Sequence, residues 1–134
     1  MKELIVEAKN ENLEKVQDFV RAELENCPPK LRAQLSIVVD EIFSNIACYA
    51  YAQQGGQVTV RLALVNDITI EFEDSGMPYD PLEKPDPNTT LDVDEREIGG
   101  LGIFMVKSLM DSVRYRRIGN KNLLTIKRNM ETIQ

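Results

Sequence analysis

The chain has 134 residues, which fits one domain of the common size of about 100–150 residues, and its 43% hydrophobic and 28% charged residues are ordinary for a globular protein. Its net charge of −6 argues against nucleic acid as a partner, and we interpret the basic residues near the C-terminus, between 114 and 128, as a solvated hairpin face. The absence of histidine excludes Ser-His-Asp and Cys-His nucleophilic sites, zinc bound by histidine and a phospho-accepting histidine.

The first half of the chain predicts one strand and two helices. The N-terminus lacks the apolar stretch of a signal peptide, and no apolar run reaches the roughly 20 residues that span a bilayer, so we expect a cytoplasmic protein without a membrane partner. Residues 3–8 read as a strand. Apolar residues at helical spacing follow Asn12, and Pro28-Pro29 ends that helix. A second helix is expected from Leu31 to Tyr51, before Gly55-Gly56.

The second half predicts two hairpins, separated by a long loop and a helix. Apolar and polar residues alternate in the strands, as in a sheet covered on one face. The expected segments are strands 58–64 and 68–72, a loop over 75–100, a helix over Leu101–Met110, and strands 112–118 and 122–128. Because hairpins outnumber strand-helix-strand crossovers, the sequence predicts one α/β (α+β) domain over 1–134. We expect a two-layer sandwich with a mixed, largely antiparallel sheet and helices on one face.

Two polar residues lie within the apolar surface of the second helix. On a helical wheel the polar arc holds Ser36, Asp40 and Ser44, whereas Glu41 and Asn45 fall among apolar residues, one turn apart. An unpaired buried polar group costs on the order of 1–3 kcal/mol, so something polar should lie opposite them. An internal hydrogen bond to a loop would satisfy them. Alternatively, Asn45 offers an oxygen to Mg²⁺ and Glu41 a base near a reacting phosphate.

The long loop begins and ends with further candidate ligand-binding residues. Asp74 and Gly76 follow a strand, where a carboxylate can accept a hydrogen bond from an amine-bearing ring that a Cβ at position 76 would obstruct. Residues 99–103, Gly-Gly-Leu-Gly-Ile, open the third helix, where free N–H groups and the helix dipole favour a phosphate. Lys107 could contribute positive charge there or simply be exposed. Each signal is weak alone, but their order and spacing are specific.

Taken together, these segments resemble the three ATP-binding boxes of the GHKL superfamily, which includes gyrase and histidine kinases. The likeness extends over nearly the whole chain and is greatest to the single-domain anti-sigma-factor serine/threonine kinases. One departure is Tyr49, where some members have histidine. The matching segments are Asp40–Asn45 with Tyr49–Tyr51, Asp74–Pro81, and Gly99–Lys107 with Met110-Asp111.

The resemblance implies a Bergerat-type ATP-binding fold with a lid at about 82–100. Glu41 matches the family's general base and Asn45 its Mg²⁺ ligand. Asp74 matches the residue that binds the adenine amino group, with Gly76 beside it. The remaining expected ATP-binding residues, around the lid glycines near the phosphates, are Gly100, Leu101, Gly102, Ile103 and Lys107.

The resemblance also implies ATP and Mg²⁺ as cofactors and two protein partners. These are an antagonist (anti-anti-sigma) protein that is phosphorylated on serine or threonine and a sigma factor that is sequestered; many members form homodimers. A non-catalytic nucleotide-binding module of the same fold is the main alternative. A histidine kinase catalytic domain and a gyrase-like ATP-driven clamp rank lower, because the chain lacks a dimerisation helix pair and a transducer domain.

Overall fold

A computed structural model of the chain describes residues 1–52, 54–83 and 98–130, with the backbone alone for 98–101. The segment from 84 to 97, most of the predicted lid, lies outside the described residues. The secondary-structure elements are β1 (Lys2–Glu7), α1 (Leu13–Glu23), α2 (Pro29–Asn45), β2 (Gln57–Leu64), β3 (Asp67–Asp74), α3 (Ile98–Leu109), β4 (Ser112–Ile118) and β5 (Lys121–Asn129), with short helical turns at Asn10–Asn12, Ile46–Ala50 and Pro81–Glu83.

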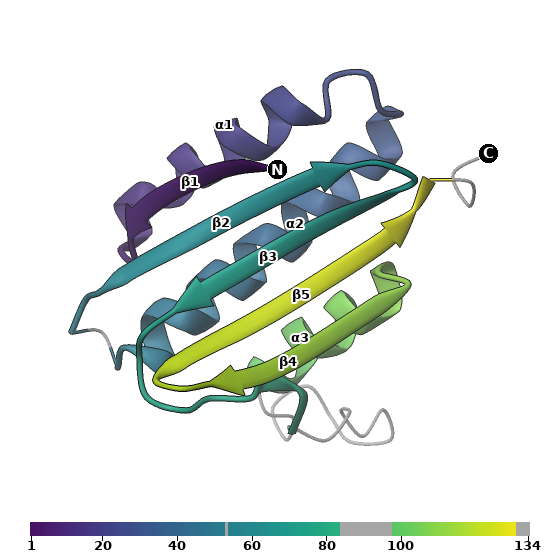
Figure 1. Cartoon of the computed structure of the whole chain (residues 1–134). Helices are drawn as coiled ribbons and strands as arrows, with labels where there is room; N and C mark the ends of the chain where they lie inside the picture. Colours follow the sequence, from purple (N-terminus) through teal and green to yellow (C-terminus); the bar gives the residue numbers. More distant parts are fainter. Residues whose placement is uncertain (53, 84–97, 131–134) are drawn as a thin grey trace.

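The five strands form one sheet in the order β1-β2-β3-β5-β4, and each neighbouring pair is antiparallel. All three α-helices lie on one face of this sheet, behind the strands in Figure 1. The predicted two-layer sandwich is therefore confirmed, and the sheet is antiparallel in every described pairing. In the same described ranges, no helix has the length and apolar character that crossing a membrane requires.

Two neighbouring strands each place a polar side chain on the helix-facing side of the sheet, near one end of the strands. In β3, Ile68, Ile70 and Phe72 are buried, and the alternation continues to Asp74, the last residue of the strand. In β5, Leu124 and Ile126 are buried, and the same phase extends back to Asn122, which pairs with Asp74 across the two strands. Because side chains alternate between the two faces of a strand, both polar residues point toward the helical layer.

The second helix ends differently from the prediction. Its α-helical part stops at Asn45, and residues Ile46–Ala50 form a π-helical turn, in place of the continuous helix expected to Tyr51. The wider turn is consistent with its role in the tertiary structure, because the Ala50 carbonyl accepts a hydrogen bond from Met77 N at 2.9 Å. Such π-helical insertions occur frequently at functional sites.

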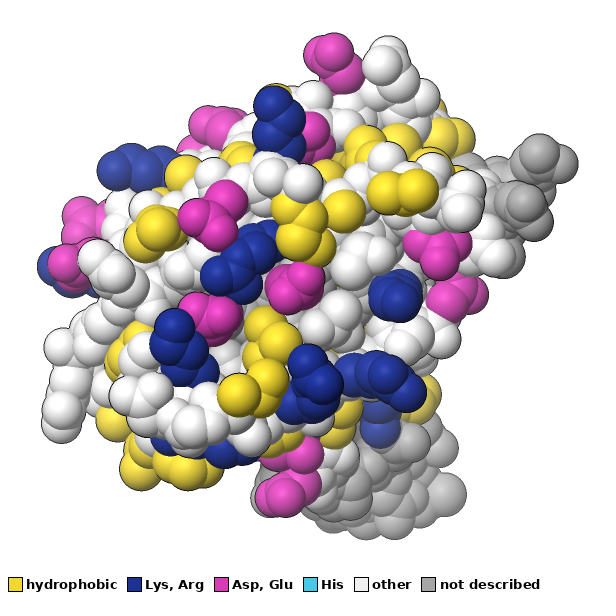
Figure 2. All heavy atoms as spheres, in the orientation of Figure 1, with side chains coloured by type: hydrophobic (Ala, Val, Ile, Leu, Met, Phe, Trp, Pro, Cys, Tyr) yellow, Lys and Arg dark blue, Asp and Glu magenta, His cyan; other side chains and the backbone are white. Residues whose placement is uncertain are grey.

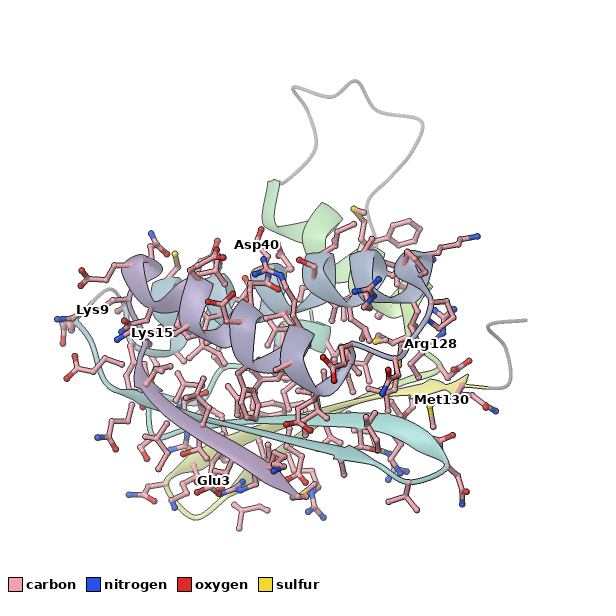
Figure 3. All side chains as sticks on the ribbon, turned by 90° about the horizontal axis from the view of Figure 1, so that it is seen from above. Glu3, Lys9, Lys15, Asp40, Arg128 and Met130 are labelled. Carbon is pink, nitrogen blue, oxygen red and sulfur yellow. The ribbon has the colours of Figure 1, made fainter. Side chains whose placement is uncertain are left out.

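The apolar surface of α2 is also less completely covered than the helical wheel suggests. Ile37 is 45% exposed and Cys48 is exposed, so Glu41 is only half-buried at the border between core and solvent, whereas Asn45 is buried. Asp40 is exposed as expected and points away from the sheet in Figure 3. Ser36, expected in the polar arc, is instead bonded through its hydroxyl to Gln17 of α1.

The sheet face opposite the helices carries charges of both signs, as Figure 2 shows. Arg61 on β2 forms ion pairs with Glu3 (2.9 Å) and Glu73 (3.3 Å), and Lys121 reaches Glu73 at 3.2 Å. The basic cluster of the C-terminal hairpin is therefore only partly the solvated face that we expected. Arg117, for example, donates to the carbonyl of Gly76 and so braces the site described below.

Candidate functional site

Glu41 and Asn45 form one hydrogen-bonded unit on α2. Asn45 is only 6% exposed, and its Nδ2 donates both to the Glu41 backbone carbonyl (2.9 Å) and to Glu41 Oε1 (2.8 Å). Since both partners are acceptors, the amide is oriented with its NH₂ toward Glu41. That orientation leaves Asn45 Oδ1 as the atom able to accept a hydrogen bond or ligate a cation. The pair thus satisfies part of its own polarity within α2, whereas the sequence-based explanation expected a hydrogen bond to a loop.

The glycine at position 102 allows α3 to approach the Glu41 carboxylate closely. A Cβ built on Gly102 would lie 2.0 Å from Glu41 Cδ and 2.0 Å from Oε1, far closer than any real contact. Gly102 is the fifth residue of α3, so the carboxylate lies near the helix end whose dipole favours negative charge. The structure therefore brings together two predicted site residues that are 61 positions apart in the sequence (from 41 to 102).

Asp74 is a buried carboxylate whose hydrogen bonds converge on one oxygen. It is 4% exposed, and its Oδ1 accepts from Gly76 N (2.9 Å) and Asn122 Nδ2 (2.8 Å). Burial raises the pKa of the Asp74 carboxyl above its ordinary value, although the hydrogen bonds from Asn122 and Gly76 and the charge of Arg117 each act to lower it. A carboxylate that costs stability in this way is typical of a functional position.

Position 76 requires glycine for a packing reason, in addition to the approach of a ligand that we expected from the sequence. A Cβ at this position would lie 2.4 Å from the Ala50 carbonyl oxygen, so only glycine lets the loop after β3 pack against the π-helical turn. The neighbouring Met77 N donates to the same carbonyl. Gly76 thereby fixes where Asp74 lies relative to the C-terminal end of α2.

A small pocket joins these parts of the site. It contains three of the predicted residues, Asn45, Asp74 and Ile103, while Glu41, Gly76 and Gly102 adjoin it through the contacts above. Lys107 is half-buried on α3 and is not among the described residues that line it. Gly100 and Leu101 lie in the first turn of α3, where the backbone alone is described. The lining residues are Ile42, Asn45, Ile46, Asp74, Tyr79, Pro81, Ile103, Tyr115, Asn122 and Leu124.

An aromatic pair supports one side of the pocket. Tyr79, which lines it, stacks on Tyr49 with ring centroids 5.1 Å apart and an interplanar angle of 22°. Tyr49 is 44% exposed and occupies the position where some members of the resembled family have histidine. Its contact with Tyr79 is an offset stack of the kind that stabilises aromatic pairs.

Asn122 is the site residue that our sequence reasoning missed. It is 3% exposed, lines the pocket and donates to Asp74. A signal was available, because Asn122 shares the apolar phase of Leu124 and Ile126, and a polar residue in that phase must meet a polar partner.

The burial of Asp74 leads to a prediction for the nucleotide-free protein. Asp74→Asn should raise the free energy of unfolding at pH 7, because a carboxyl whose pKa is raised by folding stabilises the protein when protonated and loses this contribution as the pH rises. The gain should shrink as the pH falls through the ordinary Asp range near about 4. Urea unfolding at both pH values measures it. Asp67→Asn at the other end of β3 is the control, and a less stable Asp74→Asn protein at pH 7 would contradict the prediction.

Comparison with known proteins relates the chain to ATPase domains and to protein kinases. The sequence profile described as "Histidine kinase-like ATPase domain" matches residues 6–128. The chain is 27% identical over 100 residues to the serine/threonine-protein kinase BtrW of Bordetella bronchiseptica, covering 72% of this chain and 70% of that protein.

Several relatives are named serine-protein kinase RsbW, among them one from Listeria monocytogenes serovar 1/2a and one from Bacillus licheniformis. The one from Listeria monocytogenes is 30% identical over 86 residues and the one from Bacillus licheniformis 35% over 88 residues, each covering 60% of this chain. The matches span 55% and 54% of these two relatives, little more than half of their length. The profile match covers most of the chain, including α2, β3 and α3, and confirms the resemblance to the superfamily of histidine kinases. The chain belongs to the histidine kinase-like ATPase domain family.

Proposed function

We propose that this protein binds Mg²⁺–ATP in the pocket between α2, α3 and the sheet and transfers the γ-phosphoryl group to a serine or threonine of a partner protein. The observation that carries the proposal is the Glu41–Asn45 pair, which lies against Gly102 of α3 and adjoins the same pocket as the buried Asp74. Family membership and the printed names of the relatives support the nucleotide and the reaction class.

In this proposal, each end of the pocket recognises a different part of the nucleotide. Asp74 accepts a hydrogen bond from the adenine amino group, with Gly76 holding the adjacent turn. Gly100, Leu101, Gly102 and Ile103 offer the N-terminal end of α3 to the phosphates. Lys107 lies one and a half turns beyond Gly102, where we propose that it adds positive charge near the phosphates.

Asn45 has the chemistry expected of a magnesium ligand. Its NH₂ is committed to Glu41, which leaves a neutral oxygen of the kind that Mg²⁺ prefers. Among the described residues, no group of three or more Asp, Glu or Cys side chains is placed to hold a metal ion. A metal here would accordingly take most of its ligands from phosphate and water, as is usual for Mg²⁺ at nucleotide sites. When bound, the ion supplies charge neutralisation to the phosphates.

Glu41 is the group that we propose takes the proton from the attacking hydroxyl. Its carboxylate is held by the bond from Asn45 Nδ2 on one side and by the close approach of Gly102 on the other. Phosphoryl transfer depends mainly on positioning and on stabilisation of charge, and these two contacts fix the position of the base.

We further propose an anti-sigma role in the cytoplasm. The acceptor is then an antagonist (anti-anti-sigma) protein, the second partner is a sigma factor, and the protein works as a homodimer. The likeness to kinases named RsbW and BtrW supports this regulatory setting. The negative net charge agrees with protein partners in place of nucleic acid.

Incubation with γ-labelled ATP and candidate antagonist domains tests the proposal. Label should appear on serine or threonine of one antagonist and should require Mg²⁺. Binding of ATP without any labelled protein, across all antagonists encoded near this chain's reading frame, would instead support a non-catalytic nucleotide-binding module. Failure to bind ATP would overturn both.

A further inference from the structure

Asn122 is bonded through both ends of its side-chain amide. Its Nδ2 donates to Asp74 Oδ1 (2.8 Å) and to the Met77 carbonyl (2.9 Å). Its Oδ1 accepts from the Tyr115 hydroxyl, from Tyr79 N (3.3 Å) and from Arg117 Nη1 (3.2 Å). The amide therefore joins β5, β4 and the loop after β3 at the point where the pocket meets Asp74.

This set of partners allows one orientation of the amide. Two acceptors lie on the Nδ2 side and three donors on the Oδ1 side, so a flipped amide would oppose donors to donors and acceptors to acceptors. Arg117 reinforces the orientation, because the same guanidinium nitrogen also donates to the Gly76 carbonyl at 2.9 Å. Asn122 is thus held as a donor toward Asp74.

The consequence for Asp74 concerns which of its oxygens a ligand can meet. Oδ1 already accepts two hydrogen bonds, from Gly76 N and Asn122 Nδ2, whereas the described residues supply no donor to Oδ2. A donor fixed at Oδ1 favours the ionised carboxylate, which can only accept hydrogen bonds. A purine that presents an amino group to Oδ2 gains a bond, and one that presents a carbonyl there meets repulsion between two acceptors.

We infer that Asn122 is the positioning residue that makes this pocket select a purine with an exocyclic amino group at the position facing Asp74. The inference rests on the proposed function, because it assigns a base preference to the nucleotide site. It assigns Asn122 an effect on nucleotide choice that a purely structural buried amide would not have.

The substitution Asn122→Asp removes the amide donor that faces Asp74 with little change in the shape of the side chain. Two carboxyl groups would then lie within hydrogen-bonding distance, where both cannot stay ionised and one proton is shared between them. Asp74 becomes a weaker acceptor and, when it carries the proton, a donor. Discrimination against a base that lacks the amino group, or that presents a carbonyl, should therefore fall.

Calorimetric titration with ATP, with the triphosphate of purine riboside (which lacks the amino group) and with GTP tests the inference. Wild type should bind ATP more tightly than the purine riboside analogue by about ten- to a hundredfold, the range expected for a hydrogen bond to a charged group. Asn122→Asp should reduce that ratio at least about tenfold and narrow the gap between ATP and GTP. Asn120→Asp, the same change at an exposed position of the same hairpin, should leave the ratio unchanged.

The ratio of two affinities measured on one sample is independent of the folded fraction, so partial unfolding of Asn122→Asp does not obscure the result. An unchanged ATP preference in Asn122→Asp overturns the inference and leaves the proposed function intact, provided that Asp74→Asn loses the preference. An unchanged preference in Asp74→Asn as well overturns the placement of the base at this end of the pocket. Wild-type protein that binds no ATP overturns the inference and the proposed function together.

Discussion

Replacing Glu41 by glutamine should slow phosphoryl transfer by about 10²–10⁴-fold, the usual contribution of a general base, while ATP affinity stays close to that of wild type. Glutamine keeps an oxygen that can accept the hydrogen bond from Asn45 Nδ2, so the geometry of the pair is retained and the proton acceptor alone is lost. Single-turnover transfer of label from ATP to the antagonist protein measures the rate, and equilibrium titration measures nucleotide binding.

The neighbouring carboxylate provides the matched control. Asp40→Asn removes the same charge one residue away, but Asp40 is exposed on the outer side of the helical layer (Figure 3), so transfer should continue at the wild-type rate. If Glu41→Gln phosphorylates its partner normally, Glu41 is not the base. A large loss of ATP affinity in Glu41→Gln would indicate that Glu41 supports the pocket and would leave its catalytic role without support.

Gly102→Ala should strongly reduce phosphoryl transfer. Its Cβ would overlap the Glu41 carboxylate at 2.0 Å, so either the carboxylate or the start of α3 must move. A displacement of about 1 Å at a catalytic group can cost about 10²-fold in rate, and we expect at least that loss of transfer. For stability, in contrast, helix propensity alone predicts a gain of about 1 kcal/mol in the free energy of unfolding for alanine over glycine. Transfer assays and urea unfolding of the same variant separate the two effects.

A double substitution identifies the contact responsible. Glu41→Ala with Gly102→Ala removes the overlapping carboxylate, so its unfolding free energy should exceed the value predicted by adding the two single effects. Ser108→Ala in the same helix is the control, since Ser108 is exposed and, among the described residues, its hydroxyl bonds the Phe104 carbonyl alone. Wild-type transfer by Gly102→Ala would show that α3 does not hold Glu41 in the active state.

The fold was largely predictable because apolar and more polar residues alternate regularly along its strands. Val58 to Leu62 and Ile68 to Phe72 each bury every second residue, and such a pattern determines both the hairpin and its covered face. The end of α2 could not be predicted in the same way. The π-helical turn ends at Ala50, whose carbonyl accepts a bond from Met77, a contact between segments 27 positions apart that no helical periodicity can reveal.

The candidate site was predictable where a polar residue interrupts an apolar surface. Asn45 was identified in this way and Asp74 from its place at the end of a strand before a glycine, and the structure places both in one pocket. Ile37 shows the limit, since its apolar side chain implied burial, yet the neighbouring helices leave it 45% exposed. For Asn122 the alternation along β5 indicates a buried position. Its partners, however, lie on β4 and in the loop after β3, and the sequence does not show that these segments meet it.

In the proposed binding mode, the packing of the loop after β3 on the end of α2 bears on how the pocket distinguishes ATP from ADP. Met77 bonds the Ala50 carbonyl, and Gly76 lies too close to that oxygen for any side chain, so the main chain sets the separation of Asp74 and Asn45. In that binding mode, ADP would contact Asp74 through its adenine as ATP does. A preference for ATP over ADP therefore has to arise beside α3, where Gly102 meets Glu41. Substitutions in the loop after β3 should lower the affinities for ATP and for ADP by the same factor.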